Sequence, residues 1–402
     1  MNIRLTLAVV ALVAGLSSAA DWPQFRGPDA AGVSSETNLP TTWSKTANVK
    51  WKAETPGRSV SSPVVFGNNV YLTSASGANG ERLHVQCFAA DTGKLLWHRQ
   101  LTATGNTGCH PKSSMAAPTP CANADGVYCL FATADLACFD PDGNLKWYRS
   151  LTGDYPNISN QVGMASSPVL YKDSLIVPMD TVGDSFLAAI DTQYGKNVWK
   201  VGRAKEINWV TPTVRKVGDK AEIIFSAGKE TVAYDPNDGK KVWSFAGAGA
   251  SVPTALTAGD RVLLPVNGSF TCLKPKGTGM ETEWQSQKLK TSYTTPLVYD
   301  GKIYALTSAL TLVCADLKTG REVWTERIGK GNAAFWASPI AADGKIYTFD
   351  DEGVCTVLKA GDKTEVLAVN EMKEEILGTP AIANGALYIR TINGIYCIVA
   401  KN

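Results

Sequence analysis

Few residues of this chain stand at spacings that could do chemistry by themselves. Three histidines, His84, His98 and His110, do not form a spacing typical of a three-histidine metal site. The sequence contains no Cys-x-x-Cys, His-Glu-x-x-His, Gly-x-Ser-x-Gly or Gly-x-x-x-x-Gly-Lys-Ser/Thr motif. Acidic clusters at 140–143 and 350–352 lack the alternating ligands of an EF-hand and are predicted to be turns. The sequence therefore predicts no metal site and gives no support to the common hydrolase and nucleotide-binding classes.

The nine cysteines of the chain fall into two groups. Members of the first group share one recurring strand position, occupied elsewhere by alanine, which indicates a small buried slot and packed thiols rather than bridges. These are Cys87, Cys138, Cys272, Cys314, Cys355 and Cys397. For the other three, Cys109, Cys121 and Cys129, the sequence leaves two disulfides open, Cys109 to Cys121 or Cys129 to Cys138.

The segment His110-Pro111-Lys112-Ser113 is the first candidate for a functional site. His110 could act as a base and Lys112 as a partner for an anion. Both lie in one of two long links, 97–118 and 147–168, and variable loops on a rigid scaffold commonly carry binding residues. We therefore predict that the face with these links is the functional face. The alternative is a solvated loop in which the histidine caps a turn.

A second candidate is a set of residues three positions before a proline that recurs along the chain: Val60, Met115, Ala165, Trp209, Ala250, Tyr293, Trp336 and Leu377. Trp209, Tyr293 and Trp336 would form an aromatic rim around a channel mouth. Its expected polar neighbours are Arg203, Asn208, Asp180 and Arg390. Such a rim could bind a planar or carbohydrate ligand or a peptide. The alternative is that these side chains simply fill the channel.

The elements that must position these residues repeat along the chain. A small residue followed by proline occurs eight times, at Pro63, Pro118, Pro168, Pro212, Pro253, Pro296, Pro339 and Pro380. After each proline come a β-rich stretch, an Asn- or Gly-containing turn, and further strands, a pattern typical of antiparallel hairpins. Tryptophans recur at intervals of 40 to 52 residues, at Trp51, Trp97, Trp147, Trp199, Trp243, Trp284 and Trp324, with Leu367 in the next position. Such a period indicates propeller blades, and structural packing is the favoured interpretation of the tryptophans.

The repeat count predicts an all-β, eight-bladed β-propeller of four-stranded antiparallel blades. Only three strands follow Leu367, ending near Cys397, whereas residues 48–51 have an outer-strand sequence with no strand before them. We predict that strands from both termini join in one blade and close the ring, which removes an exposed sheet edge.

The pattern Ala-x-Asp-x-x-Thr-Gly-x-x-x-Trp carries a family resemblance. It is seen around Asp91, Gly93 and Trp97, and again around Asp316, Gly320 and Trp324. It resembles the tryptophan-docking motif of pyrroloquinoline-quinone (PQQ) repeat propellers, a family with BamB-like assembly factors and PQQ dehydrogenases. The resemblance covers essentially the whole chain after residue 20, including the opening Asp-Trp-Pro-Gln-Phe-Arg-Gly. It implies a tryptophan girdle between neighbouring blades.

The chain begins with a segment that has the features of a secretory signal peptide, with a basic residue, an apolar run from Leu5 to Leu16 and a small-residue end at Ala20. We expect residues 1–20 to be the signal and 21–402 a single propeller domain, periplasmic or secreted and soluble after cleavage. No second segment is apolar enough to predict a transmembrane helix. The near balance of 39 basic and 37 acidic residues argues against nucleic acid as a partner.

The resemblance implies three functions. The first is a non-catalytic binding or scaffold module in envelope or outer-membrane protein assembly, with a protein or peptide partner and no cofactor. The second is a PQQ- and calcium-dependent alcohol or sugar dehydrogenase. No adjacent cysteine pair of the kind found in quinoprotein alcohol dehydrogenases occurs here, which counts against it. The third is a carbohydrate-binding propeller. We favour the first.

Overall fold

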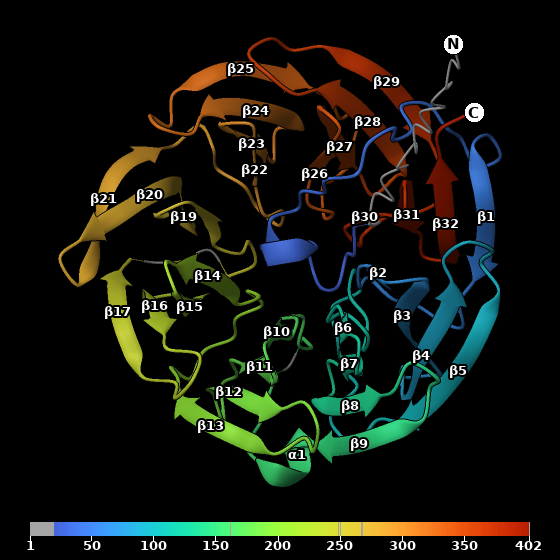
Figure 1. Ribbon diagram of the computed structural model, residues 1–402, viewed down its shortest axis with the longest axis vertical. Helices are drawn as coiled ribbons and strands as arrows, with labels where there is room; N and C mark the ends of the chain where they lie inside the picture. The colour runs from blue at the N-terminus through green and yellow to red at the C-terminus, as the bar shows by residue number, and fades with distance from the viewer. Residues whose placement is uncertain (1–19, 161, 248, 250, 267, 402) are drawn as a thin grey trace, which may run out of the picture.

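Eight four-stranded antiparallel sheets surround a central axis in the computed structural model of the chain (Figure 1), so the predicted all-β, eight-bladed propeller is confirmed. The structure describes residues 20–160, 162–247, 249, 251–266 and 268–401. The predicted signal peptide lies, apart from Ala20, outside the described residues and stays a prediction. Within the described chain, no helix has the length and apolar character needed to cross a bilayer.

The first four blades use consecutive strands, ordered from the channel outward. Blade 1 comprises β2 (Val64–Phe66), β3 (Asn69–Ser76), β4 (Arg82–Ala89) and β5 (Leu95–Thr102). Blade 2 comprises β6 (Cys121–Asn123), β7 (Gly126–Leu130), β8 (Asp135–Phe139) and β9 (Leu145–Ser150), followed by α1 (Leu151–Asp154). Blade 3 comprises β10 (Val169–Tyr171), β11 (Ser174–Met179), β12 (Phe186–Asp191) and β13 (Asn197–Gly202). Blade 4 comprises β14 (Thr213–Val217), β15 (Lys220–Ser226), β16 (Glu230–Tyr234) and β17 (Lys241–Ala246).

The remaining blades complete the ring. Blade 5 comprises β18 (Leu256–Ala258), β19 (Arg261–Val266), β20 (Ser269–Lys276) and β21 (Gly279–Ser286). Blade 6 comprises β22 (Leu297–Tyr299), β23 (Lys302–Leu306), β24 (Thr311–Asp316) and β25 (Glu322–Arg327). Blade 7 comprises β26 (Ile340–Ala342), β27 (Lys345–Phe349), β28 (Val354–Lys359) and β29 (Val366–Glu371). Blade 8 comprises β30 (Ala381–Ala383), β31 (Ala386–Arg390), β32 (Gly394–Val399) and, as its outer strand, β1 (Val49–Glu54). This pairing of β1 with β32 confirms the predicted closure.

A tryptophan from one blade docks against a glycine turn of the next. The Trp97 indole donates to the Pro141 carbonyl at 2.8 Å, and Gly143 lies directly over its ring. Gly143 has φ +81°, and a Cβ placed there would come within 2.6 Å of the indole. Glycine is therefore needed for both the backbone angle and the close approach. Gly93, Gly195 and Gly239 repeat this arrangement over Trp51, Trp147 and Trp199. Gly320 lies in the same way over Trp284, but the Trp284 indole nitrogen has no hydrogen-bond partner among the described residues.

Blade 7 corrects two positions predicted from the sequence. The position that faces the docking tryptophan on the third strand is a cysteine or alanine in all seven other blades, as the pair Cys87 and Trp97 illustrates. In blade 7 the corresponding pair is Val357 and Ala368. Leu367 therefore does not occupy the tryptophan position, and Cys355 lies two residues from the cysteine slot. Blade 7 departs from the repeat more than its sequence alone indicated, because neither signature residue is present.

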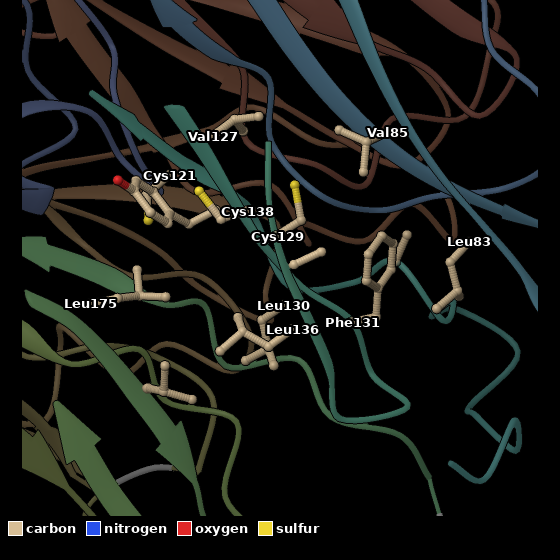
Figure 2. Packing of buried hydrophobic residues seen from close by; sticks show 14 of the residues in the cluster. Leu83, Val85, Cys121, Val127, Cys129, Leu130, Phe131, Leu136, Cys138 and Leu175 are labelled. Carbon is tan, nitrogen blue, oxygen red and sulfur yellow. The ribbon is translucent and has the colours of Figure 1, made fainter. Parts of the chain in front are cut away.

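All nine cysteines are free thiols. Figure 2 shows Cys121, Cys129 and Cys138 among the apolar side chains of blade 2. Burial raises the pKa of the Cys138 thiol to about 12. Cys109 is the exposed member of the nine. Neither of the two disulfides that the sequence left open is present in this structure.

The segment before β1 crosses one end of the central channel, where the short helix η1 (Pro28–Ala30) lies at the middle of the ring (Figure 1). Its backbone pairs with innermost strands of blades 1, 2 and 7 through Trp22, Pro23 and Gly32. Arg26 is fully buried at its centre. This guanidinium donates to the carbonyl oxygens of Pro296 at 2.8 Å and Ala31 at 3.0 Å, with longer bonds to further carbonyls. We call residues 22–34 the plug.

Candidate functional site

A cavity of about 360 Å³ lies in the central channel, on the side where the links between blades enter the innermost strands. Its wall is made of two stacked rings of residues that immediately precede the innermost strands. Phe25 of the plug contributes to its lining, and Val162 and residues 110, 112 and 113 contribute from the two long links. The cavity therefore lies on the face that the sequence analysis predicted to be functional.

The upper ring contains one residue from each blade junction: Val60, Ala117, Ala165, Trp209, Val252, Tyr293, Trp336 and Leu377. This corrects the predicted ring at two positions. Strand β6 starts two residues after Thr119, and β18 starts two residues after Thr254, just as β2 starts two residues after Ser62. Ala117 and Val252 therefore replace Met115 and Ala250. Met115 is buried, and Ala250 lies outside the described residues. The error arose because Pro118 and Pro253 lie two residues before the true repeat position, which is Pro120 in blade 2 and Ala255 in blade 5.

The lower ring is a belt of eight hydroxyl residues that the sequence analysis did not identify as a feature: Ser62, Thr119, Ser167, Thr211, Thr254, Thr295, Ser338 and Thr379. Backbone N–H groups of seven of these residues donate to the side-chain oxygen of the next residue in the belt, at 2.9 to 3.2 Å. Within the described chain, none of these hydroxyls donates to a protein acceptor. The belt thus ties the blades together while its protons remain available to a ligand. Its signal in the sequence was a Ser or Thr at every repeat.

Tyr293 and Trp336 form a flat wall on one side of the cavity. Their ring centroids are 4.2 Å apart and their planes differ by 9°. Tyr293 is 46% exposed, so the stacked pair presents a surface to solvent. The small residues Ala117 and Ala165 stand on blades 2 and 3, opposite blades 6 and 7 that carry the pair. The space left by the alanines could accept a planar ring stacked on the aromatic wall.

The long link of residues 103–117 reaches over the mouth of the cavity. The ammonium of Lys112 lies 2.6 Å from Glu375 Oε1 and 3.2 Å from Asp351 Oδ2, on the side of blades 7 and 8. The hydrogen bond to Glu375, together with Asp351, raises the pKa of Lys112. His110 is exposed, and its Nδ1 accepts the Lys112 N–H at 3.1 Å. In the neutral ring this leaves a hydrogen on Nε2.

The structure brings together six of the nine residues in the predicted site. His110, Lys112, Ser113, Trp209, Tyr293 and Trp336 all line the cavity. The other three do not. Arg203 and Asp180 form a buried ion pair at 2.7 Å, which Asn208 joins at 3.0 Å. Because Asn208 precedes Trp209, this ion pair holds the link that presents the indole. Trp209 is further fixed by its Nε1, which donates to the Gly163 carbonyl at 3.0 Å.

Arg390 was predicted at the channel mouth, but it lies buried between blades 8 and 1. Side chains on a strand alternate between its two faces, and this position of β31 faces the neighbouring blade rather than the channel. The sequence did not place it because the spacing of residues alone does not tell which face of the strand the Arg390 side chain occupies.

The residues of the cavity do not suit calcium. Its described lining residues include hydroxyls, indoles, an imidazole and an ammonium, but no carboxylate. Calcium takes several oxygen ligands, usually with carboxylates among them. Across the described residues, moreover, no group of three or more His, Cys, Asp or Glu side chains is arranged to hold a metal ion. The cavity therefore supplies neither the metal ligands nor the carboxylate base that a calcium-dependent quinone enzyme would need.

The family model described as "Outer membrane protein assembly factor BamB" matches residues 29–179 and 183–402. A BamB from Yersinia pestis is 23% identical over 341 residues, covering 83% of this chain and 72% of that protein. A polyvinylalcohol dehydrogenase from a Pseudomonas species is also 23% identical, over 57% of this chain but only 33% of that enzyme.

Solved structures with the same fold include both kinds of protein. BamB from Moraxella catarrhalis aligns with a TM-score of 0.63 at 14% identity, over 87% of this chain and 97% of that one. The quinohemoprotein alcohol dehydrogenase of Comamonas testosteroni aligns with a TM-score of 0.72 at 12% identity, over 95% of this chain and 81% of that one. At these identities the likeness concerns the fold alone.

Proposed function

We propose that this chain, which belongs to the BamB family of PQQ-like repeat propellers, is a non-catalytic binding module of the cell envelope. Its central cavity receives a ring-bearing group, such as an aromatic side chain, of a protein partner. The observation that carries this proposal is the exposed stacked pair Tyr293 and Trp336 above a belt of hydroxyl donors. Fold alone does not give this function, since the same propeller occurs in dehydrogenases.

The polar groups of the cavity favour a ligand rich in acceptors. Seven of the eight belt hydroxyls each use a lone pair to accept a backbone N–H and keep their proton. His110 offers its Nε2–H in the neutral form, and the Trp336 Nε1–H is buried without a partner among the described residues. A peptide segment supplies carbonyl acceptors together with an aromatic ring, so it matches both features of the cavity. The charge of Lys112 is already balanced by two carboxylates.

Capture from an envelope extract tests this proposal. Tyr293→Ala and Trp336→Ala should each reduce partner capture at least tenfold, because truncating a central aromatic anchor costs about 2 kcal/mol or more. Tyr194→Ala is the matched control. Tyr194 is 64% exposed in the turn between β12 and β13, on the opposite face. Equal capture by all three variants and the unmodified protein would refute the assignment of the cavity.

The dehydrogenase remains the second candidate, because the fold is shared with such enzymes. Titrating the protein with PQQ and calcium while following absorbance and melting temperature decides between the two. A ligand bound only by the native state must raise stability. The binding-module proposal predicts no saturable change, whereas a saturable spectral shift with a higher melting temperature would favour the enzyme.

A further inference from the structure

Arg390 breaks the pattern of the repeat inside the protein core. It stands two residues after Tyr388 on the second strand of blade 8. The corresponding positions in blades 2, 6 and 7 are Leu130, Leu306 and Phe349, each two residues after the equivalent tyrosine. Arg390 is only 2% exposed. A charged side chain thus occupies a slot that blades 2, 6 and 7 fill with an apolar one and that the adjacent blade 1 fills with the neutral Thr73.

The Arg390 side chain faces blade 1. The Tyr388 hydroxyl donates to the Ala90 carbonyl of blade 1 at 3.4 Å, and residues two apart on a strand point to the same side. The Nη1 of Arg390 donates to the Ser61 hydroxyl at 3.2 Å, just before blade 1 begins. Its Nε and Nη2 atoms are buried and have no hydrogen-bond partner among the described residues.

Blade 1 carries two further unpartnered polar groups on the face that it turns toward blade 8. Leu72 packs with Tyr388 in one apolar cluster, so Ser74, two residues on, also faces blade 8. Gln86 lies opposite Leu72 in the strand register and shares its face. The hydroxyl oxygen of Ser74 and the Oε1 atom of Gln86 are both buried without a partner in the described structure.

Arg390 also lacks a counter-charge. No Asp or Glu among the described residues pairs with it, and burial lowers the pKa of its guanidinium to about 9. Burying an unpaired charge is unfavourable unless another charge or a full set of hydrogen bonds compensates. Arg26 shows the second solution, since all three of its nitrogen atoms donate to backbone carbonyls. Arg390 has neither form of compensation from the protein.

We propose that blades 8 and 1 enclose a site for a small inorganic anion, of the size and charge of a halide. Arg390 supplies the charge and two N–H groups, and Ser74 supplies a hydroxyl. The Gln86 amide supplies an N–H once its oxygen and nitrogen exchange places, an exchange that ordinary structures do not distinguish. This site is separate from the central cavity and does not depend on the function proposed for it.

The anion would support the wall of the cavity. Ser61, which binds Arg390, lies between Val60 and Ser62, and both of these line the cavity. The Ser61 hydroxyl also bonds that of Ser59 at 3.0 Å, and Ser59 donates to the Ala116 carbonyl at 2.8 Å. A chain of hydrogen bonds therefore joins the proposed anion to the base of the long link.

Bromide and chloride are the probes that test this site. At constant ionic strength, replacing gluconate by chloride or bromide should raise the melting temperature by about 2 to 5 °C as the halide saturates its site. Arg390→Met should abolish this dependence. Arg327→Met is the control, because Arg327 is exposed on the outer strand of blade 6, and it should retain the full shift.

Crystals of the unmodified protein soaked in bromide give a test that needs no variant. We expect an anomalous peak within hydrogen-bond distance of Arg390 Nη2. Should Arg390→Met fail to fold, Ser74→Ala keeps the charge and should still require more halide to reach half of the shift. A water molecule in place of bromide, or a melting temperature that ignores halide, would overturn the proposal.

Discussion

The two ends of the central channel are closed in different ways. At the plug end, backbone hydrogen bonds hold the segment to the ring, with Trp22 and Val65 exchanging a pair at 2.8 and 2.9 Å. At the cavity end, the 103–117 link is held to blades 7 and 8 by the side chain of Lys112, which is 37% exposed. A buried backbone pairing is permanent on the timescale of binding, whereas a partly exposed ion pair is readily broken. The comparison indicates that the cavity end is the more easily opened end of the channel.

Removing the centre of the plug should have the largest effect on stability. Arg26→Met leaves several buried carbonyl oxygens of blades 6 and 7 without donors, and each such loss costs about 1–3 kcal/mol. We expect the free energy of unfolding to fall by about 3–5 kcal/mol. Urea denaturation followed by tryptophan fluorescence measures this change. A midpoint equal to that of the unmodified protein would show that the plug is not an integral part of the ring.

Breaking the contact between Glu374 and Lys45, near the end of the segment that precedes β1, should have an intermediate effect on stability. Burial alone would raise the pKa of Glu374, but hydrogen bonds from Lys45, Thr391 and Tyr396 and the charge of Lys52 lower it to about 2. Because this pKa is depressed in the folded state, the stabilisation is present above about pH 4.5 and is lost as the pH falls toward 2. Its size is about 2 kcal/mol, allowing for the partly exposed lysines.

Glu374→Gln should therefore lower stability at pH 7 and flatten the loss of stability between pH 5 and pH 2. Thermal unfolding across that range measures both effects. Parallel pH profiles for the variant and the unmodified protein would contradict the role of this carboxylate in anchoring Lys45 and β1.

Releasing the long link at the cavity end by a substitution of Lys112 should have the smallest effect on stability. Lys112→Met removes two partly exposed ion pairs, so the free energy of unfolding should change by less than about 1 kcal/mol. Amide hydrogen exchange should nevertheless become faster in residues 108–113, while Trp22 and Gly32 in the plug keep their protection. Unchanged exchange in the link would mean that Lys112 does not hold it over the mouth.

The sequence was informative about the scaffold because the repeat encodes it directly. Glycines such as Gly143 and the docking tryptophans mark most of the blades, so the ring and its closure could be predicted from their spacing. Blade 7 was misplaced by a residue or two because Val357 and Ala368 replace the signature pair there.

Features created by neighbours in space were harder to predict. Prolines two residues before the repeat position hid the true positions of Ala117 and Val252 in the cavity ring, and only the strand starts reveal them. Arg390 was placed at the channel because sequence spacing does not tell which face of β31 it occupies. The hydroxyl belt depends on bonds between successive blades, which no single repeat displays.

A photo-cross-linking residue with an aromatic side chain, placed at position 293 beside the cavity or at position 194 on the opposite face, tests the central claim most directly. Both tyrosines are exposed, so neither replacement should disturb the fold. After illumination in the presence of envelope extract, we predict a discrete cross-linked protein at position 293 and none at 194. Cross-linking at 194 with none at 293 would contradict the claim that the central cavity is the binding site.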